Sequence, residues 1–562
     1  MSGGRREGAT AAAAAVELEL FTHRFGAIAR QMGERLQRTA VSTNVKERLD
    51  FSCALLDAAG ELVVNAPHIP VHVGALGLCV RLTAAALPME PGDVVVTNHP
   101  GFGGSHLPDV TVVTPVFDDE GGAVGARDAR DAGDVGDAAG AEQAPALLGY
   151  VASRAHHAEI GGMRPGSMPP AACCLAEEGV VIAPTYLLRR GEARWDDLRR
   201  LLTGGRYPTR AVEENLADLR AAVAANHRGA EALRALARQS GRETVAAHME
   251  ALKRRAEERL RAALARLPAG RLETVERLDD GSPIRVCIDI GPGGARIDFT
   301  GSAGVHPGNL NAPPAVVRSA VLYVLRLLVA EPLPLNEGLL RAVELVTPPG
   351  MLAPPFPADP WQAPAVVGGN VETSQRVVDT LLKALGLVAC SQGTMNNVLF
   401  GNQRFGFYET VCGGAGAGDG FDGESGVHTH MTNTRITDPE LLEHRYPVRV
   451  ERFALRPGSG GAGRHRGGDG VVRELTFLDP MALSLLTQHR VERPYGVAGG
   501  EPGQPGRQRV VRAGGERLDL ASVDGCEVLP GDRLILETPG GGGWGDEPAE
   551  DEGAERRNHV TR

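Results

Sequence analysis

Glycine constrains the fold of this chain most, because it fills 73 of the 562 positions without a regular repeat. Average usage is about 7%, and a collagen helix would need glycine at every third position. Apolar residues make up 42% of the chain, which is too many for a disordered protein. Much of the glycine stands beside polar clusters, in GFGGSH, EIGG, VGGN, CGGAGAG and RPGSGGAG. Since glycine lets the backbone approach a ligand closely, we expect a globular protein with a site built from loops.

Charge and composition exclude several classes of function. The net charge is -11 and only 4% of the residues are aromatic, which argues against a nucleic-acid partner. The lysines Lys46, Lys253 and Lys383 lie outside any G-x-x-x-x-G-K-[ST] motif, so a P-loop is absent from this sequence. No apolar run reaches the roughly 18 residues of a membrane span. The eight cysteines form no C-x-x-C pair, which favours reduced thiols and a cytoplasmic location.

Apolar periodicity predicts a mixed α+β fold with several domains. A stripe at three- and four-residue steps predicts a helix over 17–40, and short apolar runs predict strands and turns over about 51–117. Ser240 and Glu243 have the S-x-x-E form of a capping box, which predicts the start of the second helix of a hairpin. The expected regions are a strand-rich N-terminal region at 17–205, a helical hairpin at 206–270, a central α/β region at 271–440, a β-rich region at 441–545 and a charged tail at 546–562.

Residues 118–143 form an acidic segment rich in Asp, Gly and Ala. Two valines are its only large apolar residues, so it cannot build a core and is predicted to be a solvated surface insertion. It separates two strand-like segments, 110–117 and 146–153. If the insertion only connects a long hairpin, these two strands lie side by side.

The first cluster of candidate ligands lies in the loop 98–109. Pro108 makes a regular helix through His106 and Asp109 improbable, because proline disfavours the α conformation before it. The imidazole and the carboxylate therefore stand on a loop just before a strand, where ligands are often held. The alternative is a histidine that simply hydrogen-bonds a carboxylate of the turn.

The second cluster follows the strand 146–153 and contains His156 and His157. Adjacent residues of a strand point to opposite faces, so only one of these imidazoles can face a given site. If the hairpin forms, His156 can meet His106 and Asp109. Two imidazoles and a carboxylate are a common set of ligands for a divalent metal.

The third cluster, Gly426 to Thr434, contains His428 and His430. On one strand face these two imidazoles would form a ligand pair or an acid/base pair, but a polar loop network fits the pattern equally well. Runs of amide and hydroxyl side chains lie near helices and strands, and their neutral donors and acceptors suit a small amide-like ligand. The candidate substrate contacts are Asn370, Glu372, Ser391, Gln392, Asn396 and Asn397.

Ten stretches, in this order, resemble the B-component family of hydantoinases and 5-oxoprolinases. They are NVKERLDFSCAL, HIPVHVGALG, GGSHLPDVTVVTPVF, SRAHHAEIGGMRPGSMPP, DFTGSAG, GNVETSQRVVD, SQGTMNNVLFG, YETVCGGAGAG, GVHTHMTNTRITDPE and RFALRPGSGGAGRHRGGDGVVREL. The resemblance covers about 17–545, and its C-terminal stretches look especially like the B-like half of ATP-dependent 5-oxoprolinase.

The resemblance implies a two-component enzyme with a divalent metal, Mn, Zn or Fe. Family members work with a hydantoinase A-like subunit that binds ATP and activates a cyclic amide by phosphorylation, while the B component completes ring opening. Carried over from the related acetone enzyme, the metal ligands fall on Glu47, His106, Asp109 and His156, of which Glu47 comes from KERLD. Glu159 stands where the family often has Asp, and it is a further candidate catalytic residue. On chemical grounds His428 or His430 could move the proton.

We therefore expect an ATP-dependent hydrolase of 5-oxoproline or a hydantoin, acting as a cytoplasmic hetero-oligomer without nucleic-acid or membrane partners. Two alternatives stay open at this point. One is a subunit of a biotin-independent ketone carboxylase. The other is a non-catalytic subunit that shapes a partner's active site.

Overall fold

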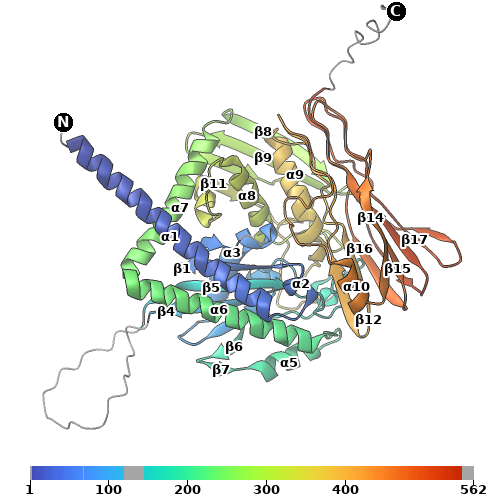
Figure 1. Cartoon of the computed structure of the whole chain (residues 1–562), viewed down its shortest axis with the longest axis horizontal. Helices are drawn as coiled ribbons and strands as arrows, with labels where there is room; N and C mark the ends of the chain where they lie inside the picture. Colours follow the sequence, from blue (N-terminus) through green and yellow to red (C-terminus); the bar gives the residue numbers. More distant parts are fainter. Residues whose placement is uncertain (1–2, 67–68, 119–144, 547–562) are drawn as a thin grey trace, which may run out of the picture.

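The computed structural model describes residues 3–66, 69–118 and 145–546, with side chains from residue 12 onward. Within these ranges the chain is a mixture of helices and strands arranged in several sheets (Figure 1), which confirms the predicted α+β class. The insertion at 118–143 and the tail at 546–562 lie outside the described residues, apart from Asp118 and Asp546.

The N-terminal sheet has seven strands in the order β2-β1-β5-β4-β3-β6-β7, and all neighbouring pairs are antiparallel. Its strands are β1 (Phe51–Asp57), β2 (Leu62–Asn65), β3 (Val94–Thr97), β4 (Asp109–Phe117), β5 (Leu147–His156), β6 (Thr185–Arg189) and β7 (Glu192–Ala193). β4 and β5 pair from Asp109 opposite His156 to Phe117 opposite Leu147. The two strands on either side of the insertion are therefore neighbours, as the hairpin interpretation predicts.

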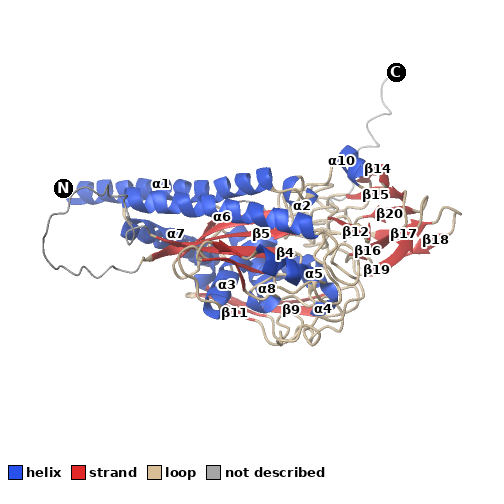
Figure 2. Ribbon diagram, turned by 90° about the horizontal axis from the view of Figure 1, so that it is seen from below, coloured by secondary structure: helices blue, strands red, loops and turns tan. Residues whose placement is uncertain are grey.

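Helices cover both faces of this sheet. α1 (Gly3–Thr39) and α6 (Val212–Ser240) lie on one side, and α3 (Pro70–Ala86) lies on the other (Figure 2). The prediction of strands and turns throughout 51–117 is wrong for α3. Ten of its residues are buried, including His72 and Thr83, so its sequence has no polar face that would reveal a helical period.

The long hairpin consists of α6 and α7 (Arg242–Leu264). Its turn differs from the predicted capping box. Ser240 is the last residue of α6, and the N-cap of α7 is Gly241, with φ +83° and no side-chain capping bond. A single glycine makes the turn because that backbone conformation is nearly restricted to glycine.

The central region contains a four-stranded sheet of order β11-β10-β9-β8, on which α9 packs through β8 and β9, while α8 packs against α9 and α3. The strands are β8 (Gly270–Arg277), β9 (Pro283–Gly291), β10 (Gly294–Asp298) and β11 (Val343–Val346), and the helices are α8 (Pro314–Leu328) and α9 (Ser374–Ala384). A buried π-helical turn, η3 (Gly369–Thr373), leads directly into α9. A Cβ on Gly369 would lie 1.9 Å from the carbonyl oxygen of Asn311, so only glycine fits where this turn begins.

The C-terminal region contains two sheets around a second apolar core that includes Phe400, Phe407 and Phe477. The four-stranded sheet consists of β12 (Asn397–Asn402), β13 (Phe405–Glu409), β16 (Met481–Leu486) and β19 (Val523–Val528). The five-stranded sheet consists of β14 (Val448–Arg456), β15 (Gly470–Phe477), β17 (Arg507–Val511), β18 (Arg517–Asp519) and β20 (Arg533–Glu537). The remaining helices are α2 (Thr43–Lys46), α4 (Leu175–Glu178), α5 (Trp195–Thr203), α10 (Pro439–Arg445), η1 (Pro100–Phe102) and η2 (Glu337–Ala342).

Two further expectations concern cysteines and membrane spans. All eight cysteines lie in the described ranges, and none of them forms a disulfide. No helix within the described part of the chain has the length and hydropathy needed to cross a bilayer.

The hairpin turn yields a stability prediction. Gly241→Ala should lower the free energy of unfolding by about 1–3 kcal/mol, because a Cβ is strained at this φ. Ser240→Ala should change it by less than about 0.5 kcal/mol, since Ser240 does not cap α7. Thermal and denaturant unfolding of the two variants measure the difference. A larger loss of unfolding free energy for Ser240→Ala than for Gly241→Ala would instead support Ser240 as the N-cap of α7.

Candidate metal centre

Three buried side chains converge where β4 and β5 meet. Nε2 of His106 lies 3.2 Å from Oδ1 of Asp109, Nδ1 of His156 lies 3.3 Å from the same oxygen, and the two ring nitrogens are 3.3 Å apart. Asp109 stands opposite His156 in the register, and His106 precedes it in the loop after η1. The three ligand atoms therefore form a nearly equilateral triangle inside the protein.

This triangle has the dimensions of a metal site. Ligands about 2.0–2.1 Å from a tetrahedral ion are separated by about 3.3–3.4 Å, close to the observed edges. Oδ1 of Asp109 and Nε2 of His156 are also buried without a hydrogen-bond partner in the described part of the chain. Unpaired buried polar atoms are costly, and an ion bound to Oδ1 would relieve that cost. The residues present fit a divalent metal.

A second layer of polar groups fixes the Asp109 carboxylate. Its Oδ2 accepts a hydrogen bond from Ser105 Oγ at 2.5 Å and lies 3.1 Å from Nε2 of His72. Nδ1 of His72 lies in turn 3.2 Å from Ser52 Oγ. Burial alone would raise the pKa of Asp109, but the His106 and His72 imidazoles hold it well below its usual range. The carboxylate is thus kept ionised with Oδ1 turned toward the other two ligands.

His156 and its neighbour His157 point in opposite directions. The His156 ring stacks on Tyr408 with a centroid distance of 4.4 Å, and burial lowers its pKa, which keeps the imidazole neutral for coordination. Nδ1 of His157 lies 3.1 Å from the Asn215 amide, on the side of α6. The alternation expected for a strand therefore selects His156.

Glu47, the fourth predicted ligand, is not part of this group. In this group, the ligand atoms that lie within 4.8 Å of one another belong to His106, Asp109 and His156, and Glu47 is not among them. Glu47 is half-buried at the end of α2, three residues before Asp50. The carbonyl oxygen of Asp50 accepts the backbone N–H of His156 at 3.0 Å, so the backbone that carries Glu47 runs beside the cluster.

Three of the predicted substrate contacts lie against this cluster. The Asn370 amide nitrogen is 3.2 Å from Nδ1 and 3.3 Å from Nε2 of His106. Glu372 Oε1 accepts a hydrogen bond from Asn397 Nδ2 at 2.7 Å, and Asn397 Oδ1 accepts one from Tyr408 at 3.0 Å. Because Tyr408 stacks on His156, this series of hydrogen bonds connects Glu372 and Asn397 to a metal ligand. Burial raises the pKa of Glu372 to about 8, so it carries a proton at neutral pH.

The other three predicted contacts lie in a separate hydrogen-bonded loop. Ser391 Oγ accepts the backbone N–H of Gly416, and Asn396 donates to Gln392 Oε1 at 2.8 Å. Arg490 donates to Oδ1 of Asn396 at 2.9 Å. These hydrogen bonds tie Ser391 to the backbone and Asn396 to Gln392 and Arg490, while Nε2 of Gln392 is buried without a partner in the described structure. The six side chains predicted as one set are divided between two places.

The predicted catalytic residues are also dispersed. Glu159 accepts hydrogen bonds from the backbone of Gly161 and Gly166 and pairs with Arg210 at 3.1 Å, so it anchors a loop. His430 Nε2 lies 3.1 Å from Asp379 Oδ1. His428 lines a different cavity of about 370 Å³, and burial, with a contribution from Arg48, lowers its pKa to about 4. The H-x-H pair does not face one common site.

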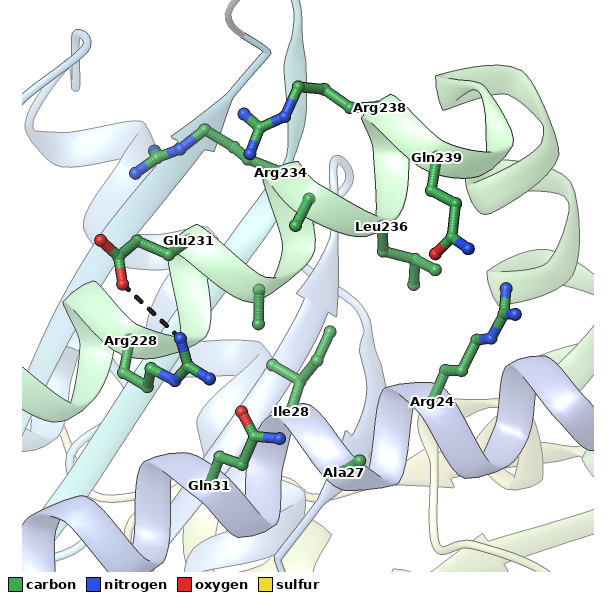
Figure 3. Close-up of a pocket in the computed structure, with 12 residues that line it drawn as sticks. Arg24, Ala27, Ile28, Gln31, Arg228, Glu231, Arg234, Leu236, Arg238 and Gln239 are labelled. Carbon is green, nitrogen blue, oxygen red and sulfur yellow. Dashed lines mark ion pairs between the residues drawn. The ribbon is translucent and has the colours of Figure 1, made fainter.

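Another cavity, of about 840 Å³, lies between α1 and α6 (Figure 3). It is lined by Arg24, Arg228 and Arg238, among others, and Glu231 pairs with Arg228 at 3.9 Å. None of the predicted ligands or substrate contacts lines it. This cavity between α1 and α6 is therefore separate from the candidate metal centre.

Comparison with known proteins agrees with the sequence resemblance. Residues 14–547 match the family model for hydantoinase B/oxoprolinase. The chain is 45% identical to 5-oxoprolinase 1 of Arabidopsis thaliana, over 94% of this chain and 42% of that protein. Curated relatives of this kind are longer, and the chain spans about two fifths of their length.

Two solved structures have the same fold. An ATP-dependent caprolactamase from Pseudomonas jessenii is 26% identical, with a TM-score of 0.82 over 94% of this chain and 91% of the other. A nucleotide-free acetone carboxylase is 17% identical, with a TM-score of 0.79 over 94% of this chain and 76% of the other. The second likeness concerns the fold alone.

The layer around Asp109 predicts how metal affinity responds to mutation. His72→Gln should weaken binding of a divalent ion at this centre by about 10- to 100-fold, because it removes a partner that orients a ligand. His157→Gln is the matched control, a buried histidine on the opposite face, and should leave affinity unchanged. Competition with a chelating indicator measures the metal dissociation constants of both variants. Equal effects of the two substitutions would contradict the assignment.

The raised pKa of Glu372 predicts a pH dependence of stability. The folded state holds a proton that the unfolded state releases above its ordinary pKa of about 4.5, so this carboxyl costs stability progressively as pH rises from 4.5 to about 8. The free energy of unfolding of the wild type should therefore fall relative to that of Glu372→Gln as the pH rises through that window. A difference between the two proteins that is constant from pH 5 to pH 8 would show that Glu372 is ionised throughout.

Proposed function

Because the chain belongs to the hydantoinase B/oxoprolinase family, we propose that it is the ring-opening component of an ATP-dependent cyclic amide hydrolase. The substrate is 5-oxoproline, which yields glutamate, or a hydantoin, which yields an N-carbamoyl amino acid. The buried triangle of His106, Asp109 and His156 carries the proposal. The relatives named 5-oxoprolinase and the caprolactamase structure support it, since both names denote opening of a cyclic amide.

The ATP-binding part of the enzyme is proposed to lie outside this sequence. The chain corresponds to about two fifths of the length of its 5-oxoprolinase relatives, and none of its three lysines belongs to a P-loop motif. A hydantoinase A-like subunit, or a further segment of the same polypeptide, would supply the missing part. The active enzyme is then a hetero-oligomer or a fused equivalent, with a divalent metal in this component.

His106, Asp109 and His156 would hold the metal, and Glu47 is the carboxylate proposed to complete the set. A bound divalent ion supplies Lewis-acid polarisation of a carbonyl oxygen and a lowered pKa for water. The carboxylate of Asp109 is oriented by Ser105 and His72, which act as positioning residues. Asn370 covers the His106 ring and presents its amide to a substrate beside it.

The protonated Glu372 offers a second way to recognise an amide. With its raised pKa it holds a proton at neutral pH, and a neutral carboxyl can donate a hydrogen bond to a carbonyl oxygen. Of the two histidines proposed to move a proton to the leaving nitrogen, His428 is the one with a free ring nitrogen. In the described structure its Nδ1 has no hydrogen-bond partner, whereas His430 is engaged by Asp379.

The reaction is tested with the full protein combined with its ATP-binding component. Glutamate release from 5-oxoproline should require ATP, and Asp109→Asn should reduce kcat by about 100-fold or more, because loss of a metal ligand removes several kcal/mol of stabilisation. His157→Gln should stay within about twofold of the wild type, since His157 faces α6. Full activity in Asp109→Asn would refute the metal-assisted mechanism and favour a structural role for this component.

Two further measurements separate the remaining alternatives. Incorporation of bicarbonate into a ketone, without glutamate release, would assign the chain to a carboxylase instead. Metal affinity of Glu47→Gln decides the ligand set. A loss comparable to that of Asp109→Asn supports a fourth ligand, and wild-type affinity would reduce the set to three.

A further inference from the structure

A second buried group of metal-binding side chains lies outside the site described above. Asp379 comes from α9, Cys390 from the segment that follows α9, and His489 from the segment after β16. All three are buried, and their ligand atoms lie within 4.8 Å of one another. His430 approaches the same group, with Nε2 3.1 Å from Oδ1 of Asp379.

The orientation of His489 is that of a metal ligand. Its Nδ1 lies 2.7 Å from the carbonyl oxygen of Glu492, so Nδ1 carries the proton and donates it to that oxygen. The lone pair of Nε2 then points into the group, where Cys390 Sγ lies 3.6 Å away. Metal-binding histidines commonly have this arrangement, with the outer nitrogen donating to a backbone carbonyl.

The Asp379 carboxylate is incompletely satisfied. Its Oδ2 is buried and has no hydrogen-bond partner within the described residues. An ionised oxygen without a partner in the interior is strongly unfavourable. A polar cluster that served only to fill the core would be expected to satisfy both oxygens, so the free one indicates a missing partner.

The surrounding backbone closes over the group. A Cβ on Gly393 would lie 2.4 Å from Nε2 of His489 and 3.0 Å from Oδ2 of Asp379. Both His430 and His489 have left-handed backbones, with φ +55° and +56°. Such conformations are unfavourable for residues other than glycine and persist where the surroundings enforce them. Of these two histidines, His430 contacts the Asp379 carboxylate and His489 contacts Cys390 Sγ, which indicates a built site closed by glycine.

We propose that Asp379, Cys390, His430 and His489 form a second metal site, which binds zinc and has a structural role. One sulfur, two imidazoles and a carboxylate make four protein ligands, and a closed four-ligand set is typical of structural zinc. Binding converts the Cys390 thiol to a zinc-bound thiolate and releases one proton to solvent. The thiolate and the Asp379 carboxylate together balance the charge of the ion.

A catalytic cysteine is a weaker interpretation of the same residues. Burial holds the pKa of the Cys390 thiol well above its usual range, so without an ion the group is protonated and unreactive.

The proposed ion would fasten together segments that are far apart in sequence. α9 follows the turn that holds Asn370 and Glu372, Cys390 precedes Ser391 and Gln392, and His430 lies two residues after His428. His489 belongs to the C-terminal region. A zinc ion here would brace the loops that carry the proposed substrate contacts, without taking part in the reaction.

The test uses the full-length protein, purified without chelator. Metal analysis should find zinc in addition to the ion at the His106 centre, and His106→Ala should keep the additional zinc. X-ray absorption of that His106→Ala protein should show one sulfur among its nitrogen and oxygen neighbours. After exchange with Co²⁺, the same protein should show sulfur-to-cobalt charge-transfer absorption.

Cys390→Ser should lose this absorption and one metal ion per chain while keeping the ion at His106. Cys412→Ser is the matched control, a buried thiol outside the group, and should retain both ions. Absence of a sulfur neighbour in the unmutated protein would overturn the proposal, even if Cys390→Ser fails to fold. Unchanged zinc content in a folded Cys390→Ser would also overturn it. Both outcomes leave the proposed reaction at the first centre untouched.

Discussion

The register between β4 and β5 is the constraint on which the candidate site depends. It sets Asp109 opposite His156 at the end of both strands and brings a carboxylate and an imidazole within 3.3 Å. A slip of one residue would turn His157 inward and His156 toward α6. The apolar faces of the sheet oppose such a slip, because helices cover both of them and every side chain would change sides. The burial of the sheet therefore determines which side chains meet at this end of β4 and β5.

Local sequence patterns predicted those parts of the site that lie on one hairpin. Strand alternation allows only one of His156 and His157 to face the site, and Pro108 keeps the residues before β4 in a loop. The choice of His156 came from the family resemblance. The groups that orient it were missed. His72 lies on α3, where ten residues are buried and no polar face reveals a helical period. Its contact with Asp109 depends on tertiary packing, which the local sequence does not show.

Contacts between distant segments explain the other differences. The amide and hydroxyl side chains look alike in sequence, yet Asn370 and Asn397 reach the metal ligands while Ser391 and Asn396 complete a loop network. His430 itself has a left-handed backbone, with φ +55°, which breaks the strand geometry that H-x-H suggests. Tertiary packing imposes such a backbone conformation, so the pattern of residue types does not predict it.

The central claim is that His106, Asp109 and His156 hold one divalent ion at the edge of the N-terminal sheet. Anomalous diffraction from crystals of the metal-loaded protein, recorded at the absorption edge of the bound metal, tests it most directly. We expect a peak about 2.0–2.2 Å from Nε2 of His106, Nδ1 of His156 and Oδ1 of Asp109. A protein that binds metal but shows no anomalous peak among these three atoms would contradict it.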